Sequence, residues 1–136
     1  QRIFYNLQEY YIGTKIIYSY TGGNDMDLKL MGDKRTLVVK IRADLDHHTA
    51  TELRKLIDAK IKSSNAINVV FDFSKVDFMD SSGIGLIMGR YKMAKILGGK
   101  VIIYGVKKQV QRIIEMSGID RLICICTSLD EAVRHI

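Results

Sequence analysis

Short apolar runs alternate with stretches of helical periodicity from Met26 onward, and this alternation limits the folds open to the chain. The runs that predict strands are Leu28–Met31, Thr36–Arg42, Ala66–Phe73, Lys100–Tyr104 and Leu122–Cys126. The first two flank the turn-forming residues 32–35 and predict a β-hairpin. Strands that alternate with helices indicate an α/β fold, with a mixed, mostly parallel sheet of about five strands and about four helices.

Four stretches carry apolar residues at helical spacing. Their stripes are Leu53, Leu56, Ile57 and Ile61; Ile84, Ile87, Met88, Tyr91 and Ala94; Val106, Val110, Ile113 and Ile114; and Leu129, Ala132, Val133 and Ile136. Thr49 with Glu52, and Ser128 with Glu131, fit capping boxes before the first and last of these helices. Because right-handed crossovers place the C-terminal ends of parallel strands at one edge, residues 72–83 are expected there, where α/β proteins usually bind their ligands.

The N-terminal segment differs in composition from the rest. Five of the seven tyrosines lie in residues 1–20, and a Gly-Gly-Asn turn signal precedes Met26. Gly22-Gly23 can be encoded by GGAGG, a ribosome-binding sequence, a short distance upstream of an ATG for Met26. The sequence therefore predicts an extraneous or disordered segment over residues 1–25 and one domain over residues 26–136. The alternative is a genuine N-terminal arm that adds an edge strand.

Composition bounds the number of domains and the kinds of partner. The chain has 136 residues and is 47% hydrophobic, which suits one folded domain. Its net charge of +6 is compatible with nucleic acid, a membrane surface or an acidic protein as partner and does not choose among them. No apolar run approaches the ~20 residues that span a bilayer. Direct nucleic-acid binding is not expected, because the basic residues lack aromatic interleaving and a helix-turn-helix pattern. Cys124 and Cys126 are predicted to be reduced, as in a cytoplasmic protein.

The segment FMDSSGIG, residues 78–85, stands where a helix should begin, but it lacks the patterns of several enzymes. It has no phosphate-loop lysine, no complete dinucleotide-binding fingerprint and no nucleophile elbow. A Ser-His-Asp triad is not favoured, because His47 and His48 begin a helix and point in different directions, and His135 lies near the chain end. Adjacent histidines and an isolated Cys-x-Cys pair predict no metal site. We therefore expect no catalytic residue, metal or cofactor.

Two interpretations remain for the serine pair. Asp80, Ser81 or Ser82 can cap the helix that starts near Gly83, and local pattern alone favours this role. Alternatively, another protein phosphorylates a serine, which adds about −1.5 to −2 charge. The helix N-terminus tolerates such an anion, whereas Asp77 and Asp80 repel it. Phosphorylation would then change partner binding without unfolding the domain.

Longer motifs carry a resemblance to a known family. DLDHHTATELR at residues 44–54, VDFMDSSGIGLIMGRYK at 76–92 and MSGID at 116–120 resemble the anti-sigma factor antagonists, whose fold is the STAS domain. The resemblance covers Met26 to the C-terminus. It implies that the unphosphorylated protein binds an anti-sigma factor serine kinase and releases the sporulation sigma factor. The kinase uses ATP to phosphorylate Ser81, and a serine phosphatase restores the protein.

The resemblance also implies the site residues. Ser81 is the phosphorylation site, and the partner-binding residues are Asp46, His47, Asp80, Ser82, Gly83, Ile84 and Arg90. The protein is expected to be a monomer when free and not to be an enzyme. Family members usually have Gly-Glu-Leu-Asp where this chain has Ala43-Asp44-Leu45-Asp46. The alternatives are a general-stress antagonist of the same kind and a small nucleotide-binding or hydrolysing domain with an anion site at Gly83.

Basic residues are frequent on the two helices that follow the serine motif: Arg90, Lys92, Lys95, Lys107, Lys108 and Arg112. They form either a solvated face or an electrostatic guide toward an acidic patch on the kinase. A guide would make association slower as salt is added.

Overall fold

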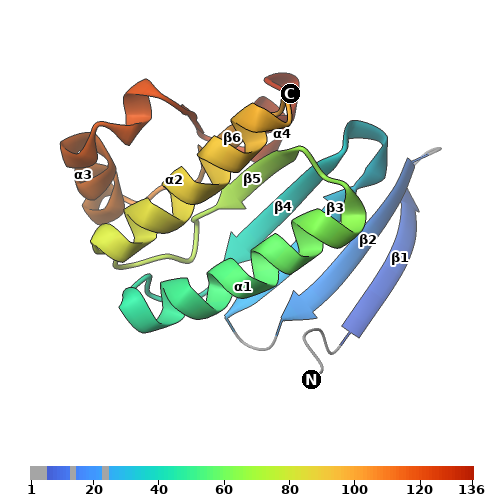
Figure 1. Cartoon of the computed structure of the whole chain (residues 1–136), viewed down its shortest axis with the longest axis horizontal. Helices are drawn as coiled ribbons and strands as arrows, with labels where there is room; N and C mark the ends of the chain where they lie inside the picture. Colours follow the sequence, from blue (N-terminus) through green and yellow to red (C-terminus); the bar gives the residue numbers. More distant parts are fainter. Residues whose placement is uncertain (1–5, 13–14, 23–24) are drawn as a thin grey trace.

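The computed structural model describes residues 6–12, 15–22 and 25–136 (Figure 1). From Met26 onward the elements are β3 (Met26–Met31), β4 (Thr36–Ile41), α1 (His47–Ser64), β5 (Asn68–Asp72), α2 (Ser81–Ile96), β6 (Val101–Tyr104), α3 (Lys108–Ser117), β7 (Cys124–Cys126) and α4 (Leu129–Arg134). Single 3-10 turns cover Gly32–Lys34 and Ile119–Arg121. This order confirms the predicted alternation of strands and helices.

The strands in the described residues all belong to one sheet, in which they follow each other in chain order. β3 pairs antiparallel with β4, and β4 to β7 pair in parallel. The part of the sheet that begins at Met26 is therefore the mixed, mostly parallel sheet expected from the sequence, with four helices around it.

Two further strands lie in the N-terminal segment. β1 (Asn6–Ile12) and β2 (Lys15–Gly22) form an antiparallel hairpin, and β2 pairs with β3. The sheet consequently has seven strands, two more than the part that begins at Met26. This arrangement matches the alternative prediction, in which an N-terminal arm adds to the edge of the sheet. The Gly-Gly-Asn signal falls largely on residues 23–24, outside the described residues. An extraneous origin of residues 1–25 stays a prediction, as does the boundary at residue 26.

The helices cover the sheet unequally. α1 and α2 lie side by side across one face (Figure 1). Because successive strand residues point to opposite faces, Val39 and Phe71 join the large core under α1 and α2. Val38 and Val70 instead join a smaller cluster with Ala132 of α4 on the other face. No helix within the described ranges is both long and apolar enough to cross a membrane.

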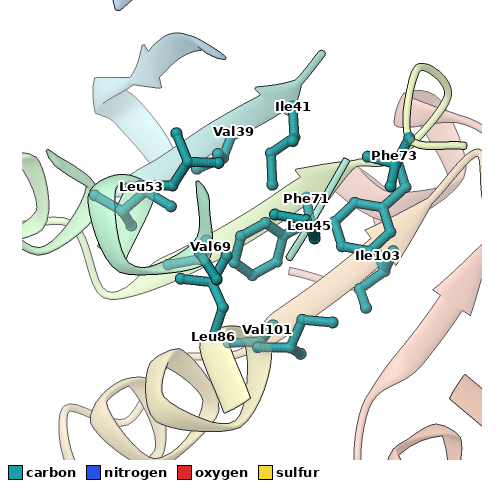
Figure 2. Packing of buried hydrophobic residues seen from close by; sticks show 14 of the residues in the cluster. Val39, Ile41, Leu45, Leu53, Val69, Phe71, Phe73, Leu86, Val101 and Ile103 are labelled. Carbon is teal, nitrogen blue, oxygen red and sulfur yellow. The ribbon is translucent and has the colours of Figure 1, made fainter. Parts of the chain in front are cut away.

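The main core is continuous between the strands and the two long helices. Figure 2 shows Val39, Val69 and Phe71 of neighbouring strands close to Leu53 of α1 and Leu86 of α2. All five side chains are buried. The core thus fixes α1 and α2 relative to the strands, and with them the loops that precede the two helices.

Candidate functional site

Residues 72–83 lie at the C-terminal edge of the parallel strands, as predicted. The carboxylate of buried Asp72 anchors this edge: Oδ2 accepts a hydrogen bond from the Tyr104 hydroxyl at 2.9 Å, and Oδ1 accepts one from the Ser74 amide at 2.9 Å. Burial and this hydrogen bond raise the pKa of Tyr104 above its ordinary value, so the hydroxyl keeps its proton. The loop toward α2 therefore starts from a fixed point.

A short parallel bridge ties the starts of α1 and α2 together. The Leu45 amide donates to the Phe78 carbonyl at 2.9 Å, and the Asp80 amide donates to the Leu45 carbonyl at 3.2 Å. Leu45 and Met79 pair across this bridge, and both are buried. Consequently Asp46 and Asp80, the residues that follow them, begin the two helices side by side.

Each of the two helices has an aspartate as its N-cap. Asp46 Oδ1 accepts from the Thr49 amide at 2.9 Å, and Asp80 Oδ1 accepts from the Ser82 amide at 2.7 Å. The predicted capping box of Thr49 and Glu52 is therefore wrong, because α1 begins three residues earlier than that pattern requires. Hydrogen bonding by Thr49 holds the pKa of the Asp46 carboxyl below its ordinary value.

Ser81 is the first residue of α2 and is exposed. Its hydroxyl has no hydrogen-bond partner in the part of the chain that the structure describes. Asp80 supplies the cap of this helix, so among the three predicted capping candidates the serine pair is not needed for that role. The Ser81 hydroxyl is accessible to a second protein.

Ser82 faces α1. It lines a groove of about 220 Å³ between the first turns of the two helices. The other lining residues are His47, Ala50, Thr51 and Arg54 of α1 and Gly85 and Leu86 of α2. The structure thus brings the predicted site residues His47 and Ser82 together. It adds the exposed guanidinium of Arg54, which no local sequence pattern distinguished from other surface arginines.

Gly83 permits the close approach of α2 to the bridge. A Cβ at this position would lie 2.2 Å from Met79 Cγ and 3.1 Å from Leu45 Cβ. Gly83 is buried, and its lack of a side chain lets α2 sit close to the bridge; that it also binds the partner stays a prediction. Ile84 is half-buried against the main core and keeps part of its side chain accessible.

Arg90 is also buried, with 6% of its surface exposed. Its Nε lies 3.0 Å from Asp58 Oδ1 of α1, an ionic contact without hydrogen-bond geometry, and its Nη1 has no hydrogen-bond partner among the described residues. Burial lowers the pKa of Arg90 from its ordinary value. The expectation that Arg90 belongs to an exposed basic face is therefore wrong, because its guanidinium is buried where α2 contacts α1. That Arg90 binds the partner stays a prediction.

The loop before α2 holds two features that the sequence reasoning missed. Phe78 is 51% exposed, which places a large apolar side chain three residues before Ser81. Asp77 forms an ion pair with Lys107, the residue that precedes α3. This pair partly neutralises one of the two carboxylates expected to repel a phosphate, and it removes Lys107 from the unpaired basic residues. The sequence signal that could have predicted the exposure of Phe78 was its place between Asp77 and Asp80 in a loop.

The departure from the usual family motif is accommodated at Ala43. Among the described non-glycine residues, positive φ occurs at Arg35 and Asn65 and not at Ala43. Since Ala43 has no left-handed backbone conformation, the alanine causes no strain where the family usually has glycine.

Comparison with known proteins agrees with this geometry. Residues 28–132 match the family described as STAS domain. An anti-sigma F factor antagonist from Paenibacillus polymyxa is 32% identical over 101 residues, which cover 74% of this chain and 86% of that protein. Another, from Lysinibacillus sphaericus, is 28% identical over 89 residues, covering 65% of this chain and 76% of the relative.

A solved structure shows the same fold. The structure of the anti-sigma factor antagonist SpoIIAA in its unphosphorylated form has a TM-score of 0.70 and 27% identity, and the alignment covers 82% of this chain and 97% of that one. The family match spans β3 to α4, the part of the sheet that the sequence predicted. The chain therefore belongs to the STAS domain family, among the anti-sigma factor antagonists.

Proposed function

We propose that the protein is a partner-switching antagonist whose binding is controlled by phosphorylation of Ser81. In its unphosphorylated form it binds an anti-sigma factor that is also a serine kinase, and this releases the sporulation sigma factor. The kinase uses ATP to modify Ser81, and a serine phosphatase reverses the modification. Support comes from relatives named anti-sigma F factor antagonists and from a structural neighbour whose unphosphorylated form is specified by name.

The exposed, unbonded hydroxyl of Ser81 carries this proposal. It lies at the start of α2 while the cap is supplied by Asp80. Around it the structure gathers accessible residues from both helices and the intervening loop. We call this the docking surface; it consists of Asp46, His47, Phe78, Asp80, Ser81, Ser82 and Ile84.

A phosphate on Ser81 affects the free domain and the complex differently. In the free domain the amides at the N-terminus of α2 and the helix dipole favour the anion, which offsets repulsion from Asp80. In a complex, the phosphate meets a partner that has excluded water. Two like unit charges about 4 Å apart repel by about 4 kcal/mol near a protein surface, and about 1.4 kcal/mol is a tenfold change in affinity. One partner carboxylate opposite Ser81 is enough to weaken binding more than roughly 100-fold.

Titration calorimetry with the cognate anti-sigma kinase tests the proposal. Ser81→Ala should bind as the unmodified protein does, whereas Ser81→Asp should bind at least about tenfold more weakly, because it places one of the two charges at the same position. Ser82→Ala is the matched control, since it removes the neighbouring hydroxyl and leaves Ser81 intact.

Intact-mass measurement after incubation with the kinase and ATP gives the second readout. The unmodified protein and Ser82→Ala should each gain one phosphate, mapped to Ser81 by fragmentation, and Ser81→Ala should gain none. Equal affinities of Ser81→Ala and Ser81→Asp, or phosphate on Ser81→Ala, would contradict the proposal.

A further inference from the structure

Three metal-ligating side chains meet at β7, on the sheet face opposite α1 and α2. Cys124 Sγ and Cys126 Sγ lie 3.5 Å apart, and both cysteines are free thiols. The ligand atoms of Cys124, Cys126 and His135 all lie within 4.8 Å of one another. The sequence reasoning treated the two cysteines and His135 as unrelated, and the structure brings them together.

The fold fixes each of the three positions. Cys124 and Cys126 are two residues apart on a strand and so point to the same face. α4 follows its N-cap Ser128, returns across that face and packs Ala132 in the same cluster as Cys126. His135 follows as the C-terminal cap of α4, and its backbone carbonyl accepts a hydrogen bond from Lys100 Nζ at 2.8 Å. The closeness of the three ligand atoms therefore depends on β7, on α4 and on the hydrogen bond from Lys100.

We propose that Cys124, Cys126 and His135 form a binding site for a thiophilic divalent cation, and that zinc(II) is the ion that this donor set fits best. Two thiolates and one imidazole are common zinc ligands, and three protein ligands leave a fourth position for water or another donor.

The geometry is close to that of a tetrahedral site. With Zn–S of about 2.3 Å and Zn–N of about 2.0–2.1 Å, tetrahedral ligands lie about 3.8 Å apart for two sulfurs and about 3.5 Å apart for sulfur and nitrogen. The observed sulfur–sulfur distance of 3.5 Å is near this value. The imidazole has to approach by at most about 1.3 Å, from the 4.8 Å limit to about 3.5 Å, and the side chain of His135 is exposed and has room to do so.

The surroundings give access to the ion. Cys124 and His135 line a surface pocket of about 340 Å³. The carboxylate of Glu131 lies next to Cys126, where it accepts a hydrogen bond from the Thr127 amide at 3.1 Å and adds negative charge that favours a cation. Lys95 and Lys100 also line the pocket and oppose the cation. We therefore expect a weaker affinity than that of a closed four-ligand site.

Zinc titration of the full chain, under a non-thiol reductant and against a chromophoric chelator, tests the inference. The unmodified protein should bind one Zn²⁺ per chain. Cys124→Ser should abolish this binding. His135→Gln should weaken it by more than the roughly 10-fold to 100-fold that loss of an outer-shell partner costs. His48→Gln is the matched control, because it removes an exposed histidine far along the chain and should leave zinc affinity unchanged.

Cobalt(II) substitution provides a readout that a purely structural role would not move. Thiolate-to-cobalt charge-transfer absorption should appear in the unmodified protein and in His48→Gln, and be lost in Cys124→Ser. Circular dichroism without metal checks that each variant is folded; Cys124 is half-buried, so serine is tolerated there better than at buried Cys126. Zinc affinity equal in all four proteins, or loss of zinc binding in His48→Gln alone, overturns the proposal.

Discussion

Adding one methyl group at Gly83 should destabilise the domain. A Cβ there would lie 2.2 Å from Met79 Cγ and 2.5 Å from Met79 Sδ, and the Met79 side chain is 1% exposed. Since carbon atoms in contact are about 3.5–4.0 Å apart, Met79 or the start of α2 has to move by roughly 1.3 Å or more. Overpacking of this kind costs about 1–3 kcal/mol, and alanine returns at most about 1 kcal/mol through its higher helix propensity. We expect Gly83→Ala to lower the free energy of unfolding by up to about 2 kcal/mol, the overpacking cost less the propensity gain.

Gly85 offers the matched control in the same helix. A Cβ at Gly85 would meet no atom within 4 Å apart from its chain neighbours and the nearby backbone of its own helix, and the residue is exposed. Gly85→Ala should therefore raise the free energy of unfolding by up to about 1 kcal/mol, the propensity term alone. Urea unfolding followed by circular dichroism measures both variants, and their midpoints should move in opposite directions from that of the unmodified protein.

Met79→Ala completes the test as a double-mutant cycle. Removing Cγ and Sδ should relieve the clash, so Gly83→Ala should cost less in the Met79→Ala background, with a coupling energy of at least about 0.5 kcal/mol. If Gly83→Ala and Gly85→Ala unfold at the same urea concentration, the close seating of α2 on the bridge is refuted.

Three other perturbations address the caps and charges. Asp80→Ala removes the N-cap of α2 and should cost about 1 kcal/mol in urea unfolding; no change would mean that another group caps the helix. Asp58→Asn leaves the buried guanidinium of Arg90 unpaired. It should cost about 1–3 kcal/mol, less than a fully buried pair because the Asp58 side chain is 36% exposed, and nearly nothing in an Arg90→Met background. The association rate with the kinase should fall as ionic strength rises, and Lys92→Gln with Lys108→Gln should flatten that dependence; a stopped-flow rate that ignores salt would exclude the electrostatic guide.

Hydrophobic periodicity predicted most helices and strands because each contacts the core along one stripe of side chains. The same helical spacing also indicates that Arg90 is buried. The buried residues of α2 recur at that spacing: Gly83, Leu86, Ile87, Arg90 and Ala94. The sequence reasoning centred the stripe on neighbouring apolar residues and assigned the arginine to the surface. Its ionic partner on α1 is distant in sequence, so no local pattern reveals what makes the burial of this charge tolerable.

The prediction of where α1 starts failed for a different reason. Both Asp46 and Thr49 are good N-cap residues, and the histidines after Asp46 give no apolar periodicity that would choose between them. The choice is made by the bridge from Leu45 to Met79, a contact between segments far apart in the chain. The cluster of Cys124, Cys126 and His135 likewise exists because α4 folds back over β7.

The pairing of β2 with the whole of β3, from Met26 to Met31, bears on self-association. A translation product that began at Met26 would leave one side of β3 with unsatisfied amides and carbonyls facing water. Such an exposed edge strand is a template to which a strand of a second molecule can pair. The longer and shorter products would then share the proposed Ser81 phosphorylation site but differ in their tendency to aggregate. The β1–β2 hairpin would protect the edge of β3 against edge-to-edge association.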